Sequence, residues 1–331
     1  MPFILPSATI LLCVLTLLPL WRHPHWTVRG LDFPRIQLAA FAAFILTAQL
    51  AITAFGKSAD LRVVLPALLC LVWHLTRIAP YSKFWPTEVK DCTGHDKAKR
   101  LSILTANVLT PNRDSARLIR VVRKYRPDIL VTVESDNWWQ DRLDTLAPEM
   151  PYAIKQPQDN LYGMHVYSRR PLENSRISFL VQDDVPSIHC RVTLGTGDAV
   201  QLHILHPAPP SPTENPKASQ RDAELQIVAR TVAENGSPTI VAGDLNDVAW
   251  SRTTRSFRKI SGLLDPRVGR GMFNTFHARY PFIRWPLDHV FHSPHFTLSS
   301  IRRLPDIGSD HFPLFVELMQ GTSQKAPQKK E

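Results

Sequence analysis

Six short polar motifs, each directly after an apolar run of the kind that forms a strand, constrain this chain more than any other feature. They are Thr105-Ala106-Asn107, Val133-Glu134-Ser135, Leu205-His206-Pro207, Ala242-Gly243-Asp244-Leu245-Asn246, Leu287-Asp288-His289 and Ser309-Asp310-His311. Carboxylates, carboxamides and imidazoles placed repeatedly where strands end predict one polar pocket assembled from distant segments. Such an oxygen-rich pocket suits a hard divalent cation such as Mg²⁺, which takes one or two carboxylates and substrate phosphate oxygens. The pattern therefore predicts a site that hydrolyses a phosphoester.

The chemistry of phosphoester hydrolysis accounts for these residue types independently. The reaction needs an in-line water, a group that removes its proton, and positive charge beside the equatorial phosphate oxygens. A bound metal supplies charge and orientation. An Asp–His pair supplies an imidazole of fixed tautomer that exchanges a proton near neutral pH. Loss of one such preorganised group is expected to cost roughly 10²–10³ in rate.

Taken together, the motifs resemble those of the endonuclease/exonuclease/phosphatase superfamily, the deoxyribonuclease I-like enzymes. The resemblance runs from about Leu101 to Leu318 and includes three further pieces: Arg126-Pro127-Asp128-Ile129-Leu130, Gly163 to Pro171, and Asn274-Thr275-Phe276. One such motif alone occurs by chance, whereas six in the right order are specific. The layout also resembles the bacterial membrane-bound members of the superfamily, among them a group associated with glycopeptide-antibiotic resistance.

This resemblance implies a metal site. Glu134 resembles the metal-ligand carboxylate, and Asn107 lies beside it in the metal or phosphate shell. Asp310 resembles a second carboxylate near the metal. The implied cofactor is Mg²⁺, with Mn²⁺ as the alternative.

The same resemblance implies the catalytic residues. His311 resembles the imidazole that acts on the phosphate or the nucleophile, and Asp288 resembles the residue that orients it. Asp244 resembles the group that positions or deprotonates the attacking water. Asn246 resembles the amide that holds a phosphate oxygen, and His206 the second histidine that binds the phosphate.

Other polar residues have simpler interpretations. Asp244 to Asn246 alone could form a turn, since Gly, Asp and Asn favour turns. His289 follows Asp288 on an alternating strand, so its side chain is expected to point away from the pocket and to have a structural role. By the same alternation, His203 faces away from His206 and is expected to pack. Trp138-Trp139 is expected to pack on a helix face.

One departure from the abasic-site endonucleases affects the expected substrate. Their tyrosine motif is not found here, and a proline-rich loop, Pro207 to Pro212, follows His206 instead. A stiff loop directly after that histidine is expected to lie close to the site and to shape the substrate entrance. This difference disfavours a role in DNA repair but does not affect phosphoester hydrolysis.

The first eighty residues contain three apolar runs without charged side chains. No charged side chain occurs between Met1 and Arg22 or between Arg35 and Lys57, and a third run extends from Val63 to Thr76. A bilayer is crossed by around 20 predominantly apolar residues. We therefore expect three transmembrane helices, at about 3–20, 36–55 and 61–80. A cleaved signal peptide explains only the first run, and buried helices of a soluble protein are the other alternative.

The expected organisation has four parts: a membrane anchor at 1–80, a linker at 81–100, a catalytic domain at 101–319 and a disordered tail at 320–331. Within the catalytic region strand-like and helical patterns alternate, which indicates α/β or α+β layers. The superfamily resemblance implies a four-layer α-β-β-α sandwich with the site at one edge of two packed sheets.

The net charge indicates an anionic partner but does not distinguish between kinds of anionic partner. The formal net charge of +10 fits phospholipid headgroups, nucleic acid or phosphorylated substrates generally. The four cysteines have no metal-type spacing. We expect a multi-pass protein of the bacterial inner membrane, with the bilayer as a partner and no protein partner indicated.

Two indications conflict about which side of the membrane carries the catalytic domain, and the cytoplasmic side is slightly favoured. With three spans, Arg22, Arg29, Arg35, Arg77, Lys83 and Lys90 lie on the side of the catalytic domain, and Lys57 and Arg62 on the other. The positive-inside rule then favours the cytoplasm. The resemblance to glycopeptide-resistance proteins favours the outer face, where lipid-linked wall intermediates are processed.

The interpretation is a membrane-anchored, divalent-metal-dependent phosphoesterase. Its substrate would be a phosphodiester, or a phosphomonoester or pyrophosphate, with a phospholipid or lipid-linked compound favoured by the anchor. A nuclease acting on DNA or RNA is the alternative. A non-catalytic membrane scaffold would need a decayed pocket, and every expected polar position is filled.

Overall fold

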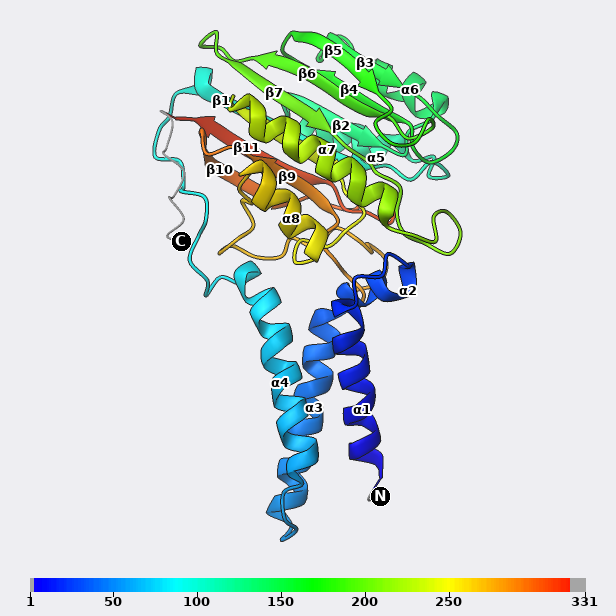
Figure 1. Cartoon of the computed structure of the whole chain (residues 1–331). Helices are drawn as coiled ribbons and strands as arrows, with labels where there is room; N and C mark the ends of the chain where they lie inside the picture. The colour runs from blue at the N-terminus through cyan, green and yellow to red at the C-terminus, as the bar shows by residue number, and fades with distance from the viewer. Residues whose placement is uncertain (1–2, 322–331) are drawn as a thin grey trace.

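The computed structural model describes residues 3–321, and it has an apolar helical bundle below a unit of two β-sheets (Figure 1). Residues 322–331 of the tail predicted at 320–331 lie outside the described residues, and Gln320 ends the last strand. The α-helices are α1 (Ile4–Leu17), α2 (Trp26–Arg29), α3 (Arg35–Ala54), α4 (Leu61–Ile78), α5 (Ser115–Tyr125), α6 (Asn137–Leu143), α7 (Ser219–Asn235) and α8 (Arg252–Ser261).

Eleven strands form two sheets in the described chain. The six-stranded sheet has the order β10-β11-β1-β2-β4-β3 and the five-stranded sheet the order β5-β6-β7-β8-β9. The strands are β1 (Arg100–Asn107), β2 (Ile129–Val133), β3 (Tyr152–Gln156), β4 (Met164–Ser168), β5 (Leu172–Ser178), β6 (Ser187–Thr193), β7 (Ala199–Ile204), β8 (Thr239–Asp244), β9 (Asp288–His292), β10 (Phe296–Arg303) and β11 (Leu314–Gln320).

The two sheets pack face to face and helices cover their outer faces. Strand alternation sends Ile103 of β1 into the core between the sheets and Leu104 to the opposite face. Leu118 of α5 and Trp139 of α6 pack on that outer face. On the other sheet, α7 and α8 pack against β8 and β9 through residues such as Phe257. The result is the four-layer α-β-β-α sandwich that the resemblance implied, a mixed α/β architecture.

Each sheet contains one parallel pair, and these pairs position the site. In the first sheet β1 runs parallel to β2 across α5, and in the second β7 runs parallel to β8 across α7. Parallel strands joined by a crossover end at the same edge of their sheet. The carboxyl ends of all four strands therefore deliver their following residues to one end of the sandwich.

The N-terminal bundle is apolar on its outside as well as its inside. Leu12, Ala42 and Ala67 are fully buried between the three helices, whereas Leu50 and Leu69 are each 70% exposed. Two of the helices, Arg35–Ala54 and Leu61–Tyr81, are long and apolar enough to cross a membrane. The first apolar helix, Ile4–Leu20, is shorter than these two. The structure thus supplies two such helices among the described residues where the sequence predicted three.

The bundle is joined tightly to the sandwich. The Trp250 indole donates a hydrogen bond to the Asp32 carbonyl at 2.8 Å, and the Tyr81 hydroxyl donates to the Ala249 carbonyl at 2.8 Å. The segment at 81–100, interpreted above as a linker, also packs on the sandwich. Its Cys92 amide donates to the Leu298 carbonyl of β10 at 2.7 Å.

Candidate active site

The predicted polar residues converge at one end of the sandwich, where the two sheets meet. Asn107 ends β1, and Glu134 directly follows β2. On the other sheet Asp244 ends β8 directly opposite Asp288, the first residue of β9. Because β9 is antiparallel to β8, its beginning and the end of β8 share one edge.

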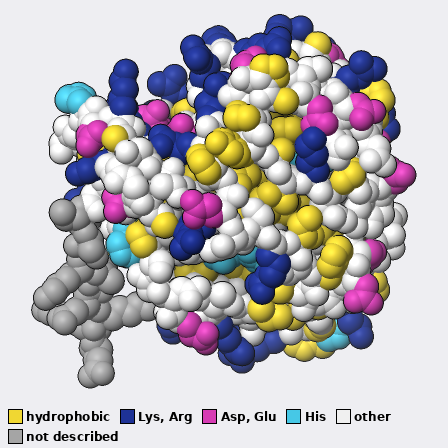
Figure 2. All heavy atoms as spheres, turned by 90° about the horizontal axis from the view of Figure 1, so that it is seen from above, with side chains coloured by type: hydrophobic (Ala, Val, Ile, Leu, Met, Phe, Trp, Pro, Cys, Tyr) yellow, Lys and Arg dark blue, Asp and Glu magenta, His cyan; other side chains and the backbone are white. Residues whose placement is uncertain are grey.

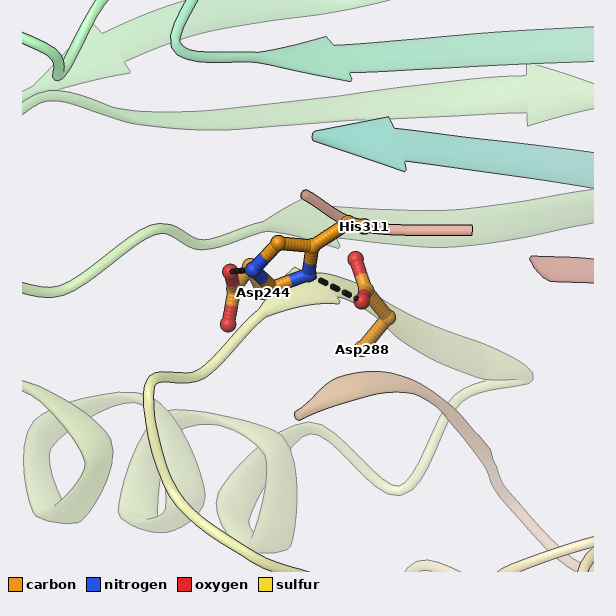
Figure 3. A group of neighbouring side chains, drawn as sticks. All are labelled: Asp244, Asp288 and His311. Atoms are coloured by element: carbon orange, nitrogen blue, oxygen red, sulfur yellow. Dashed lines mark hydrogen bonds and ion pairs between the residues drawn. The ribbon is translucent and has the colours of Figure 1, made fainter. Parts of the chain in front are cut away.

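The centre of the site is a chain of three side chains, Asp288, His311 and Asp244 (Figure 3). Nδ1 of His311 lies 2.7 Å from Oδ2 of Asp288, and Nε2 lies 3.5 Å from Oδ2 of Asp244. All three side chains are buried. The imidazole is therefore held with one ring nitrogen on each carboxylate.

This arrangement stabilises a protonated imidazole. Burial disfavours the charged ring, but the neighbouring Asp288 and Asp244 carboxylates outweigh burial and raise the pKa of His311 to about 10. Burial also raises the pKa of Asp244, against the opposing effect of His311. The positive ring thus lies between two carboxylates, and the raised pKa of the buried Asp244 carboxylate suits it to accept a proton.

Glu134 projects from a left-handed backbone position, with φ of 57°, immediately after β2. Its Oε1 accepts a hydrogen bond from the Asn107 amide at 2.6 Å, and the same amide lies 3.2 Å from Oδ2 of Asp244. Its Oε2 is buried without a hydrogen-bond partner among the described residues. Burial raises the pKa of Glu134 to about 8, and the Asn107 hydrogen bond only partly offsets it.

The two residues expected to hold the phosphate lie on the loops after β7 and β8. His206 is buried, and its Nε2 is 3.9 Å from Oε1 of Glu134. Burial lowers the pKa of His206 to about 4, so this imidazole is neutral. Asn246 donates its backbone N–H to Asp244 at 2.9 Å and its side-chain amide to the Pro207 carbonyl at 3.0 Å. These bonds fix the turn that carries Asn246.

A pocket of about 250 Å³ opens onto these groups. Its lining combines predicted site residues with residues from several loops, namely Phe33, Glu134, Leu161, Tyr162, His206, Pro209, Pro210, Glu214, Asn246, Phe276, Leu287, Asp310 and His311. No Lys or Arg side chain lines the pocket in the described part of the chain. An anionic substrate would therefore meet carboxylates and imidazoles there, with little fixed positive charge.

The donor set fits a hard divalent cation. Glu134 and Asp310 both line the pocket, and the unpartnered Oε2 of Glu134 is an oxygen that a cation would satisfy. Asp244, Asp288 and His311 also lie close enough together to hold an ion. In that group, however, both ring nitrogens already face carboxylates, so the site around Glu134 is the better candidate.

Several residues outside the predicted motifs complete the pocket. The Tyr162 hydroxyl donates a hydrogen bond to Glu214, and the Tyr162 ring lies 5.6 Å from the ring of His206. Behind the site the fully buried Arg221 of α7 donates to the Asn246 carbonyl at 2.7 Å. Neither Tyr162 nor Arg221 lies in a motif. Phe33, from the N-terminal region, also lines the pocket.

The residues expected to pack away from the site do so. His289 is buried, with Nε2 2.9 Å from the Asp247 carbonyl oxygen. His203 contacts His189, with Nδ1 atoms 2.7 Å apart. Trp139 is fully buried on α6. The proline-rich loop supplies Pro209 and Pro210 to the pocket, as expected of a loop that shapes the entrance.

Comparison with known proteins matches the chain to a family. A model of the Endonuclease/Exonuclease/phosphatase family matches residues 104–311. No curated protein sequence matches the chain significantly.

Solved structures resemble the sandwich at low sequence identity. An endonuclease/exonuclease/phosphatase from Beutenbergia cavernae is 19% identical with a TM-score of 0.55, over 68% of this chain and 72% of that chain. The human Nocturnin catalytic domain with bound sulfate is 16% identical with a TM-score of 0.56, over 72% and 99%. The D. rerio TDP2 complex with a single-strand DNA product is 19% identical with a TM-score of 0.54, over 66% and 98%. At this identity the likeness establishes the fold alone.

Proposed function

The chain belongs to the endonuclease/exonuclease/phosphatase family, and from this premise we propose that it is a membrane-anchored, divalent-metal-dependent phosphoesterase. The observation that carries the proposal is the Asp288–His311–Asp244 chain beside an acidic pocket. A buried proton-transfer group next to oxygen ligands is what hydrolysis of a phosphoester requires.

Each residue of the site has a role in this proposal. Asp244 accepts the proton of the attacking water, because it is buried and its pKa is raised. The charged ring of His311, oriented by Asp288, stabilises negative charge that develops on the phosphate oxygens. Asn246 and the neutral His206 donate N–H groups to the phosphate.

Glu134, Asp310 and Asn107 would hold the metal ion. When bound, a divalent cation supplies positive charge to the phosphate and orients it. Mg²⁺ is the proposed ion, because the ligands are oxygen atoms and the pocket has room for water and substrate oxygens beside them.

The outer surface of the N-terminal bundle supports the membrane anchor. Phe44, Leu50, Leu65 and Leu69 are between 54% and 70% exposed. Apolar side chains on the outside of several adjacent helices form a larger exposed patch than soluble monomers tolerate. The proposal is that α3 and α4 span the bilayer of the bacterial inner membrane and that Ile4–Leu20 crosses beside them.

A membrane phosphoester is the preferred substrate, and nucleic acid is the second candidate. The TDP2 structure with its DNA product shows that a protein of this fold binds nucleic acid. In this chain, however, the pocket lacks Lys and Arg among the described residues. On the face remote from the N-terminal bundle, Lys and Arg side chains lie among acidic and hydrophobic ones (Figure 2).

A substrate panel tests the proposal on the full chain in detergent. The panel contains a soluble aryl phosphodiester, phospholipid in mixed micelles, a prenyl pyrophosphate, single-stranded DNA and RNA. We expect Mg²⁺-dependent release from the soluble ester and faster release from one of the lipid substrates. Preferential cleavage of DNA or RNA would favour the nuclease, and no hydrolysis of any substrate with Mg²⁺ or Mn²⁺ would refute the phosphoesterase.

A further inference from the structure

An apolar groove adjoins the catalytic pocket. It has a volume of about 310 Å³ and is lined by Trp26, Gly30, Phe33, Pro34, Pro210 and Trp285. None of these side chains carries a charge. Phe33 and Pro210 line both the groove and the catalytic pocket, so the two cavities share a wall.

Aromatic rings connect the catalytic imidazole to the groove. The Phe276 ring lies 4.9 Å from the ring of His311 and stacks on Trp285 at 6.1 Å. Trp285 in turn meets Phe33 edge to face at 5.5 Å. The path from the reacting centre to the groove is therefore hydrophobic along one side.

The groove lies at the top of the helical bundle. Four of its lining residues lie between α1 and α3, and α3 begins at Arg35, directly after Pro34. In Figure 1 this region, which includes α2, lies where the bundle meets the sandwich. If α3 spans the bilayer, the groove is level with the lipid headgroups and the first part of the lipid chains.

A neighbouring loop of the sandwich presents hydrophobic side chains at the same level. Phe282 is 88% exposed, Tyr280 57% and Ile283 46%. The Gln37 side chain of α3 donates a hydrogen bond to the Phe282 carbonyl at 2.8 Å, so this loop lies against the start of the helix. The Ala278 amide donates to the Asp310 carbonyl at 2.6 Å, which ties the loop to the catalytic pocket. Exposed aromatic residues are characteristic of the membrane interface.

We propose that this groove binds the hydrocarbon chain of a membrane phospholipid whose phosphate lies in the catalytic pocket. The inference rests on the proposed phosphoesterase function and names its substrate class. A phospholipid fits both halves: its polar phosphate faces Glu134 and His311, while its chain leaves past Phe33 towards the bilayer. The exposed loop at 280–283 lies among the lipids and brings the pocket to the substrate.

Photochemical labelling tests the groove without requiring catalysis. The full chain is reconstituted in phosphatidylcholine vesicles that contain phosphatidic acid with a diazirine near the start of one acyl chain. After irradiation, we expect label on peptides that contain Trp26 to Pro34 or Trp285. A series of Gly30→Ala, Gly30→Leu and Gly30→Trp adds side chains of increasing size to a residue that lines the groove. A Cβ at Gly30 meets nothing within 4 Å, so the series introduces no backbone clash.

Gly30→Ala is the matched control and should label as the wild type does. Gly30→Trp should reduce groove labelling by at least about sixteenfold, since it displaces two or more methylenes and each changes occupancy about fourfold. Gly30→Leu should fall between the two, and labelling of α3 inside the bilayer should stay constant. Thermal unfolding of each variant shows that it is folded.

Equal groove labelling across the folded series, or label confined to the bundle, would overturn the proposal. Glu134→Gln should label like the wild type, because it removes hydrolysis and leaves the groove intact. A wild-type chain that is labelled in the groove but hydrolyses none of the substrates would count against the phosphoesterase alone. Hydrolysis of the soluble ester without groove labelling would count against the groove alone.

Discussion

At the residue scale, the orientation of His311 by Asp288 decides whether the site works as a unit. Asp288→Asn keeps the shape of the side chain but removes the charge that holds the protonated ring, so we expect a loss of at least about 10²-fold in hydrolysis rate. His311→Ala should cost at least as much, and the double variant should lose little more than His311→Ala alone, because the two residues act together. The rate at which each variant hydrolyses the soluble phosphodiester measures these losses.

If the rate losses of the two single variants multiplied in the double variant, the two side chains would act independently. Asp183→Asn on the exposed surface serves as the control for a simple loss of carboxylate charge and should be neutral.

The buried Glu224 of α7 should make the stability of the fold depend on pH. Its side chain is buried, Oε1 has no hydrogen-bond partner among the described residues, and burial raises the pKa of Glu224 to about 8. The folded state therefore holds this proton more tightly than the unfolded chain, in which the carboxyl has its ordinary pKa of 4.5. The stability this group contributes is full below 4.5 and declines as pH rises through about 8.

Glu224→Gln should remove that decline. We expect the variant to have a higher unfolding temperature than wild type at about pH 8.5 and a similar one at about pH 4.5. Glu234→Gln, exposed on the same helix, should change neither value. If Glu224→Gln lowered the unfolding temperature at the higher pH, the carboxylate would have an unrecognised cationic partner.

At the element scale, the close approach of β7 and β8 holds the catalytic turn in place. Gly243 has φ of 135°, and a Cβ there would lie 2.1 Å from the Leu205 carbonyl oxygen. Gly243→Ala should destabilise the fold by about 3 kcal/mol, from backbone strain and overpacking together. Thermal unfolding measures this, with Gly30→Ala as a neutral control at an open position. An unchanged unfolding temperature for Gly243→Ala would show that β7 and β8 separate easily.

The strands that precede the motifs, such as β1 and β8, could be predicted from the sequence, because burial on both faces makes them continuous apolar runs. The polar residue after such a run then marks the edge where the site forms, as at Asn107 and Asp244. The edge strands β3 and β5 were not predicted, since one side of each faces solvent and the residues are mixed. The interior strands β4 and β6 were not predicted either. Helix α8 is largely polar and was also missed, although Ser251 caps its start and Gly262 follows its end.

The wall that the N-terminal region contributes to the pocket could not be predicted. Phe33 lines the pocket together with Phe276, and no periodicity links positions so far apart in the chain. The same applies to Arg221, whose contact with Asn246 depends on how α7 packs. Long-range packing of this kind is decided by the complementarity of whole surfaces, which short motifs do not encode.

At the scale of the whole molecule, three membrane crossings would place the α3–α4 turn and the sandwich on opposite sides of the bilayer. Single cysteines at Ser58 in that turn and at Thr196 on the sandwich, both exposed, report the two sides. The background carries Cys92→Ser. Following the positive-inside rule, we expect a membrane-impermeant maleimide to label Ser58→Cys in intact bacteria and Thr196→Cys only after lysis.

The reverse pattern would place the sandwich outside the cell and would agree with processing of lipid-linked compounds on the outer face. Labelling of both positions in intact cells would contradict three crossings, because α4 is the one span between the two positions and a crossing there puts them on opposite sides.

The central claim is that the strand-end residues form one metal-dependent phosphoesterase site. Its most direct test is the rate of soluble phosphodiester hydrolysis by the full chain as Mg²⁺ is added back after EDTA treatment. Wild type and the exposed control Glu173→Gln should regain activity together, whereas Glu134→Gln should stay lower by roughly 10²–10³ at every Mg²⁺ concentration. A Glu134→Gln enzyme that regains the wild-type rate with Mg²⁺ would contradict the account, because the metal would then be bound elsewhere.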